Sequence, residues 1–216
     1  METKLAREVD EAISLFERAL ALDPRSVEAQ SGLANSLAAR ALSGMSSSAA
    51  TDLEHSERLV AQALAGSPDD PFAHFAKGEV LRAQGRPEEA IPEYEAAIAH
   101  NHNSVLAIFA LGRCKFWTGS IHEVIPLEEQ AIRLSPRDPS IYLFYSQIGL
   151  VHLVQSRTDE AIVWFEKASK LNSVQPGYHA YLASAYAIEG DFERAATELS
   201  EARRLSGDDR YTSIPV

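Results

Sequence analysis

The sequence is poor in cysteine, with Cys114 the only one among 216 residues. An intramolecular disulfide is therefore excluded, and with it a disulfide-stapled secreted fold. The N-terminal stretch METKLAREVDEA lacks the apolar core of a secretory signal. The most apolar run, Ile141 to Val154, is shorter than the roughly 20 residues that span a bilayer, and it contains Ser146 and Gln147. These absences predict a cytoplasmic protein with no membrane partner.

Basic residues are also scarce. Lys and Arg number 20 against 31 Asp and Glu, which gives a formal net charge of −11 and a pI near 5.1. Binding to a phosphate backbone requires a basic footprint on the protein. We therefore expect no nucleic-acid partner.

Motifs for catalysis and cofactor binding are missing as well. There is no G-x-G-x-x-G, no phosphate-binding G-K-[ST] and no C-x-x-C. The HEVIP stretch at His122 has Pro126 where a zinc-protease helix needs its second histidine. The HNHN stretch, residues 100–103, is interpreted as a turn, because Asn tolerates the left-handed conformation that ends helices. Cys114 has no patterned His or Asn to activate it, so we expect a buried structural thiol. We predict no enzymatic activity, no cofactor and no metal.

An internal repeat is what the sequence does contain. Two small residues stand seven positions apart with a larger residue between them, and this triplet occurs six times, once with Glu128 in the middle. The triplets are Ala12–Phe16–Ala19, Ser56–Val60–Ala63, Ala90–Tyr94–Ala97, Val124–Glu128–Ala131, Ala161–Phe165–Ala168 and Ala195–Leu199–Ala202. Their last members are 44, 34, 34, 37 and 34 residues apart. The small residues allow two helices to approach, and the large residue fills the space between them.

Proline and glycine residues between the triplets indicate that the helices are arranged in pairs. Proline follows the helical stretches in ALDP, AGSP and RLSP, as expected just beyond a helix end. Gly85, Gly119 and Gly190, with Ser156 as a stand-in, are placed where the two helices of a pair turn. The first helix of several pairs carries a hydrophobic residue followed by a small one. These are Leu33-Ala34, Leu111-Gly112, Ile148-Gly149 and Leu182-Ala183.

With these features the chain resembles tetratricopeptide-repeat arrays over nearly its full length. The resemblance implies an all-α solenoid, a right-handed superhelix of antiparallel helix pairs with about eleven helices. The expected helices span residues 4–22, 26–42, 51–66, 71–84, 87–100, 104–117, 121–134, 139–156, 158–171, 176–189 and 192–206. The expected organisation is one array: a leading half-repeat 1–26, then repeats 27–70 (with an insertion), 71–104, 105–138, 139–175 (with an insertion) and 176–209, and a tail 210–216.

A narrower resemblance rests on AIRLSPRDPSIYLFYSQIGLVHL and EAIVWFEKASKLN, together with the long insertion in an early repeat. These stretches are similar to tetratricopeptide regions that follow bacterial adenylate cyclase domains or the winged-helix domains of some regulators. This similarity implies that the chain is a regulatory part of a larger signalling protein.

In such arrays the first, or leading, helix of each pair lines a concave groove that holds a partner segment. Projection at 3.6 residues per turn gives the expected lining. It consists of Asn35, Phe72, Phe75, Glu79, Arg82, Leu106, Phe109, Arg113, Phe116, Trp117, Leu143, Gln147, Leu150 and Tyr181. We expect about half of the aromatic rings to pack inward between repeats instead of facing a partner.

The kind of partner follows from this lining. Chaperone-binding arrays hold a C-terminal carboxylate with Lys, Asn and Arg, but here only Asn35 matches, and Ala76, Leu106 and Ala110 occupy the other positions. An apolar or amphipathic protein segment is therefore favoured over a terminal carboxylate. Two alternatives remain: a homo-oligomerisation module of a cyclase-like or regulator parent, and an accessory region to an enzymatic domain absent from this chain.

Overall fold

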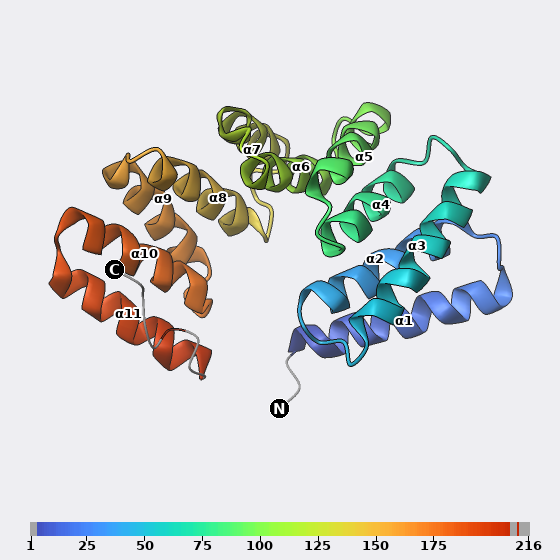
Figure 1. Cartoon of the computed structure of the whole chain (residues 1–216), viewed down its shortest axis with the longest axis horizontal. Coiled ribbons are helices and arrows are strands. Elements are labelled where there is room, and N and C mark those ends of the chain that lie inside the picture. The colour runs from blue at the N-terminus through green and yellow to red at the C-terminus, as the bar shows by residue number, and fades with distance from the viewer. Residues whose placement is uncertain (1–3, 208–210, 212–216) are drawn as a thin grey trace. The chain divides into compact units, whose positions relative to one another are not determined.

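A computed structural model describes residues 4–207 and Tyr211, so the rest of the predicted tail lies outside the described residues. All regular structure within this range is helical (Figure 1), as predicted. The chain divides into two compact units, Met1–Gly119 and Ser120–Val216. Each unit is considered by itself below. The boundary falls inside the predicted repeat 105–138, and the repeat boundaries themselves stay a prediction.

The first unit contains six helices among its described residues. They are α1 (Lys4–Leu22), α2 (Val27–Leu42), α3 (Ala49–Gly66), α4 (Pro71–Ala83), α5 (Pro87–His100) and α6 (Val105–Trp117). Helix α2 packs against α1, α3 and α4, and α4 packs against α5 and α6. Helix α3 begins two residues before the expected position, because the inserted residues lengthen it as well as forming the loop 43–48.

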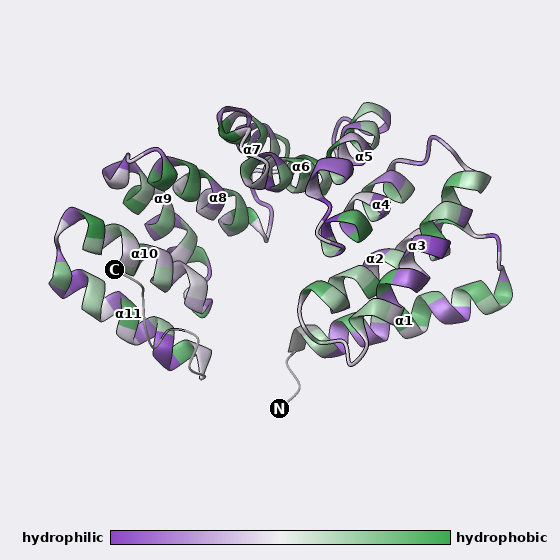
Figure 2. Ribbon diagram, viewed as in Figure 1, coloured by the Kyte–Doolittle hydropathy of each residue, from purple (hydrophilic) through white to green (hydrophobic). Residues whose placement is uncertain are grey.

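The second unit continues the pattern. It contains a 3₁₀ turn η1 (Ile121–Glu123), then α7 (Val124–Leu134), α8 (Ile141–Val154), α9 (Thr158–Leu171), α10 (Pro176–Glu189) and α11 (Phe192–Ser206). Helices α8 and α9 pack together, as do α9 and α10 and the pair α10 and α11. Figure 2 shows α8 coloured as hydrophobic along much of its length, whereas α11 alternates between hydrophobic and hydrophilic bands. No helix in residues 4–207 is long and apolar enough to cross a membrane.

Side-chain caps stabilise the starts of α2, α4 and α11. The Asp70 carboxylate accepts the backbone N–H of Ala73 at 2.7 Å, and Pro71 occupies the first turn of α4. Asp191 accepts the N–H of Arg194 at 3.0 Å in the same way at the start of α11. Both contacts satisfy a backbone donor that has no partner within the helix.

Two kinds of turn alternate along the chain. Leading helices end in a left-handed residue: Gly85, Gly119 and Gly190 have φ of 73°, 87° and 84°, and Ser156 has 58°. The predicted turns at these four positions are confirmed. Glycine suits three of them because it adopts a positive φ without steric cost.

The second helices α3, α5, α7 and α9 end differently. The HNHN stretch is a turn, as predicted, but Asn101 does not use the left-handed conformation that Asn tolerates, since it has φ −141° and ψ 87°. Ser67, Ser135 and Asn172 end their helices at nearly the same angles, with φ between −143° and −136°. The residue that follows each of these helices thus has an extended backbone, and a positive φ does not explain the Asn at position 101.

At several helix contacts a glycine faces a large ring. A Cβ added to Gly78 on α4 would lie 2.4 Å from the ring of Tyr94 on α5. The same holds for Gly149 and Phe165 in the second unit, at 2.6 Å. Tyr94 and Phe165 have no exposed surface. The large triplet residues therefore fill the space between helices, as predicted.

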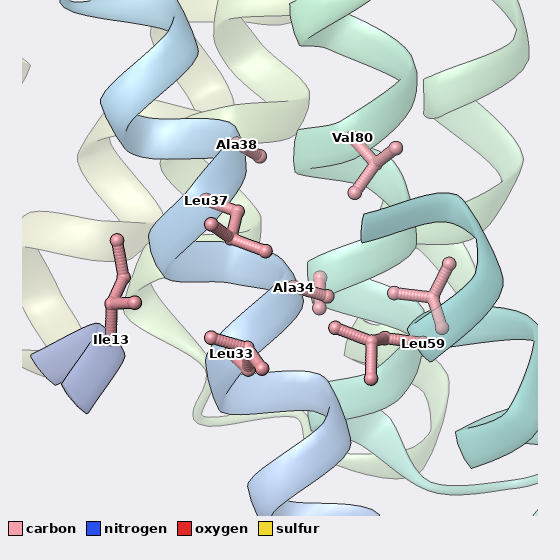
Figure 3. Close-up of a cluster of buried hydrophobic side chains, with 9 residues drawn as sticks. Ile13, Leu33, Ala34, Leu37, Ala38, Leu59 and Val80 are labelled. Atoms are coloured by element: carbon pink, nitrogen blue, oxygen red, sulfur yellow. The ribbon is translucent and has the colours of Figure 1, made fainter. Parts of the chain in front are cut away.

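One core cluster of the first unit lies between α1, α2, α3 and α4. Leu33, Ala34, Leu37 and Ala38 project from α2 into this cluster (Figure 3). They meet side chains from the neighbouring helices, namely Ile13, Leu59, Val60, Ala76 and Val80. Small alanines stand beside leucines on the buried side of α2, which allows neighbouring helices to pack against it.

An ion pair ties three helices together beside the inserted loop. The Arg40 guanidinium on α2 donates to both carboxylate oxygens of Asp52 on α3, at 2.9 and 2.8 Å, and to Asp10 on α1 at 3.2 Å. Asp52 is buried, and the hydrogen bond from Arg40 lowers the pKa of its carboxyl. A bidentate charged pair of this kind fixes the orientation of both side chains.

Candidate functional site

The candidate site is the leading-helix face of the first unit, which we define as Asn35 on α2, Phe72, Phe75, Glu79 and Arg82 on α4, and Leu106, Phe109, Arg113, Phe116 and Trp117 on α6. Helix α4 packs against both α2 and α6, so these positions come from neighbouring elements. On α4 and α6 they recur at intervals of three and four residues, apart from the adjacent Phe116 and Trp117, and this spacing places them along one side.

Aromatic rings form the buried part of this face. Phe75 stacks on Phe72 with ring centroids 6.0 Å apart, and it also meets Tyr94 at 6.1 Å. Phe75 and Phe109 are buried, with 8% and 9% of their surface exposed. These two predicted lining residues therefore serve packing, which is the outcome expected for part of the aromatic set.

Other predicted residues are open to solvent. Phe72 exposes 40% of its surface, Leu106 exposes 60% and Trp117 exposes 74%. The Trp117 ring contacts Phe116 edge-on at 5.4 Å. Large apolar side chains at this exposure, repeated along neighbouring helices, are typical of interaction surfaces.

A polar cluster lies beside the rings. Tyr94 donates its hydroxyl hydrogen to Glu79 at 2.7 Å, and the Arg82 guanidinium donates to both Glu79 oxygens, one of them at 3.2 Å. Burial alone would lower the pKa of Arg82, but the hydrogen bond and charge of Glu79 more than offset it, and the pKa is raised. Burial raises the pKa of Tyr94, and Glu79 adds to this. The negative charge of Glu79 is thus balanced by Arg82, and its carboxylate also accepts a hydrogen bond from Tyr94.

Arg113 has a different environment. Its guanidinium carbon lies 5.6 Å from the centre of the Phe109 ring, a cation–π contact. In the described part of the chain it forms no ion pair and its guanidinium donates no hydrogen bond. Burial lowers the pKa of Arg113, and the positive charge of Arg82 lowers it further.

The predicted lining residues of the second unit are mostly taken up by packing. Leu150 and Tyr181 pack against the cluster around Phe165, and the rings of Tyr181 and Phe165 are 5.2 Å apart. Gln147 is buried with 7% of its surface exposed, and Leu143 is half-buried. The accessible predicted residues are therefore concentrated on the first unit.

Cys114 and the HNHN histidines, which the sequence analysis weighed as a nucleophile and as metal ligands, lie in the following environments. Cys114 is buried, as predicted, and burial raises the pKa of its thiol to about 11. In the HNHN stretch, one ring nitrogen of His102 lies 2.8 Å from the Ile98 carbonyl oxygen. Among residues 4–207 and Tyr211, no three His, Cys, Asp or Glu side chains gather as metal ligands would.

Two histidine sites escaped the sequence analysis. His74 places one ring nitrogen 2.7 Å from Glu93 and the other 2.8 Å from the Pro68 carbonyl oxygen. His179 does the same with Glu198 at 2.7 Å and the Ser173 carbonyl at 3.0 Å. In both cases His and Glu are 19 residues apart, and this shared spacing is the signal that could have revealed them. Each pair joins a leading helix to its partner helix.

The structure also shows a depression of about 250 Å³ between α3 and α4. Its walls are mainly apolar, from Val60, Ala61, Leu64, Val80 and Leu81, with Glu57, Lys77 and Gln84 also lining it. Nothing in the repeat pattern pointed to this hollow, because its size depends on how the two helices cross.

Solved structures of low sequence identity share the fold. A chain in the crystal structure of the APC/C hetero-tetramer Cut9-Hcn1 matches with a TM-score of 0.82 and 17% identity, over 94% of this chain and 38% of that one. PilW, a widely conserved type IV pilus biogenesis factor, matches with a TM-score of 0.75 and 15% identity, over 95% and 89% of the two chains. YrrB, a TPR protein with an unusual peptide-binding site, gives 0.60 and 18%, over 91% and 94%. The present chain thus spans well under half of the Cut9-Hcn1 chain.

Sequence comparison identifies the family. No curated protein sequence matches the chain significantly. The family model for the tetratricopeptide repeat matches residues 6–41, 44–104 and 147–210, well over half of the chain. Together with the paired helices, the alternating turns and the small–large–small triplets, this match shows that the chain belongs to the tetratricopeptide-repeat family.

Proposed function

We propose that this chain is a non-catalytic protein-interaction scaffold, and that the leading-helix face of its first unit binds an apolar or amphipathic segment of a partner protein. The observation that carries the proposal is the exposure of Phe72, Leu106 and Trp117 on neighbouring helices. The same helices bury the rings of Phe75 and Phe109. Exposed apolar side chains on a rigid support supply binding energy when a partner covers them. Tetratricopeptide arrays are built for this use, since stacked pairs leave extended surfaces.

The cellular setting is part of the same proposal. We infer a cytoplasmic protein from the single buried thiol Cys114. We further infer that the chain acts as a regulatory part of a larger signalling protein, which rests on the resemblance to tetratricopeptide regions that accompany cyclase and winged-helix domains.

Peptide display tests the binding proposal. Random peptides displayed on phage are selected on the purified full chain, and the enriched peptides are synthesised and titrated by fluorescence anisotropy. Leu106→Asp is expected to weaken binding at least tenfold, because a charge on this exposed position opposes apolar contact. Leu22→Asp is the matched control, since Leu22 is 90% exposed on α1, away from this face. Equal losses in both variants, or no enriched peptide at all, would contradict the proposal.

The second candidate function is self-association through the same exposed residues. Trp117, with 74% of its surface exposed, favours it, because such a residue is also suited to a symmetric contact. Light scattering during size-exclusion chromatography distinguishes the two. A dimer that Leu106→Asp converts to a monomer supports self-association, and a monomeric wild-type chain supports the scaffold.

A further inference from the structure

Arg113 and Glu79 occupy equivalent positions in successive leading helices. They are 34 residues apart, one repeat, and each lies seven positions after an exposed apolar residue, Leu106 and Phe72 respectively. The surroundings of the two charges differ. Glu79 is held by Arg82 and Tyr94. The residue equivalent to Arg82 in the next helix is Phe116, which carries no charge.

The guanidinium of Arg113 is therefore a charge without a counter-charge among the described residues. Its nearest charged neighbours, Arg82 and Glu79, already neutralise each other. The side chain is half-buried over the Phe109 ring, so water solvates it only in part. Such a cation gains more from an added carboxylate than a fully hydrated one does, because part of its desolvation has already occurred.

We propose that Arg113 receives the side-chain carboxylate of an Asp or Glu within the partner segment. This deepens the proposed function and rests on it. The planar guanidinium offers paired N–H donors that match a carboxylate. On α6, Leu106 and Trp117 lie on the same side as Arg113, at intervals of seven and four residues. The occupant is thus a segment of another protein with one acidic residue flanked by apolar ones.

An internal carboxylate fits this site better than a chain terminus. A terminal carboxylate is held by several donors from successive leading helices. Among the positions that would supply them, only Asn35 carries a donor side chain, and the others are Ala76, Leu106 and Ala110. One Arg between apolar neighbours fits one side-chain carboxylate.

The test uses a library of twelve-residue peptides whose C-termini are fused to the phage coat, so that no free terminal carboxylate is present. The full chain is screened as wild type, as Arg113→Gln and as Arg133→Gln. Arg133 is the matched control, because its side chain is 68% exposed on α7 and its replacement removes the same charge. The best peptide is then made with a C-terminal amide, once with its acidic residue and once with the isosteric Asn or Gln. Circular dichroism verifies that each variant is folded.

The wild type and Arg133→Gln are expected to enrich Asp or Glu between apolar residues, and Arg113→Gln is not. The amide peptide is expected to bind the wild type at least tenfold more weakly than the acidic one, and this difference should disappear in Arg113→Gln. Arg113→Lys, which keeps the charge but loses the paired donors, should lie between. If Arg113→Gln does not fold, Arg113→Lys and the two peptides on the wild type decide the question.

Several results would overturn the inference. Equal binding of the acidic and amide peptides by the wild type is one, and an acidic preference that survives in Arg113→Gln is another. A wild-type dimer that Arg113→Gln splits would make a second copy the occupant. If peptides bind and only Leu106→Asp removes them, the inference fails while the scaffold proposal stands. If no peptide is enriched on any variant, both fail.

Discussion

At the scale of the residue, pairs of glycine and aromatic ring control the spacing of the helices. The periodic triplets led directly to Tyr94 and Phe165 as the large fillers. Of their partners, Gly149 was among the small residues noted on the leading helices, whereas Gly78 was missed, since it has no side chain and leaves no hydrophobic signal. Which residue faces a ring depends on the crossing of two helices, and a projection of one helix does not contain that angle.

Gly78→Ala is expected to lower the free energy of unfolding by about 1–3 kcal/mol, because the added methyl would lie 2.4 Å from the buried Tyr94 ring. Urea unfolding followed by circular dichroism measures the change. Gly66→Ala is the matched control in the same unit, since its nearest neighbour is a Val27 methyl at 3.6 Å. Ala is the better helix former, so this control should be neutral or slightly stabilising. Similar losses in both variants would show that the ring contact is not the cause.

The candidate site was predictable only in part, because the sequence pattern of one helix does not show contacts between helices. Helical spacing placed Leu106 and Trp117 among the lining residues, and both are exposed, whereas their role in binding stays a prediction. Spacing could not tell that Phe75 and Phe109 are covered, or that Glu79 binds Tyr94 from α5. Those contacts join residues from different helices, and the lack of a partner at Arg113 became visible only once they were known.

At the scale of the element, the lengths and limits of the helices followed closely from the sequence. Prolines and glycines mark their ends, and the helix bounds deviate from the expected ones by at most a few residues. The exception is α7, whose first turn, expected to be α-helical, is 3₁₀ over Ile121–Glu123. Pro126 follows within one turn and has no N–H to donate, which favours a late start of the α-helix.

The tie between α1, α2 and α3 carries a pH dependence. Arg40 lowers the pKa of Asp52 below its ordinary value of 3.8 in the folded chain. The carboxylate therefore stabilises the fold at neutral pH, and this contribution is lost as the pH falls through the lowered pKa. At pH 7, Asp52→Asn should reduce the free energy of unfolding by about 1–3 kcal/mol, the range for a hydrogen-bonded charged pair.

The difference between wild type and Asp52→Asn should shrink below pH 4, because the Asp52 carboxyl of the unfolded chain then takes up a proton more readily than that of the folded chain. Chemical unfolding at a series of pH values from 7 to 3 measures it. Glu54→Gln, an exposed neighbour on α3, is the control and should change little. A difference that stays constant across this range would mean that the charge of Asp52 is not what stabilises the fold.

At the scale of the whole molecule, the chain is acidic, with 31 Asp and Glu against 20 Lys and Arg. Unbalanced negative charge keeps molecules apart in solution at neutral pH. The division into two units was not predictable, since the repeat pattern runs through Gly119 without a composition change.

Solubility should reach its minimum near pH 5.1, where the formal net charge vanishes. Turbidity of concentrated solutions between pH 4 and 8 measures this, at low salt so that charge is not screened. Added salt at neutral pH should change the turbidity little. A minimum far from pH 5 would point to a specific association between copies instead of loss of net charge.

The loop 43–48 between α2 and α3 has a practical consequence. It stands where the other helix pairs turn through a single left-handed residue, and the inserted residues there leave the core between α1 and α4 intact. A hairpin turn of this array thus accepts extra chain without disturbing the scaffold. A fluorophore-bearing tag or a small reporter domain grafted at Gly44 would let binding at the leading-helix face be followed in living cells, with both chain ends left free for fusion to other modules.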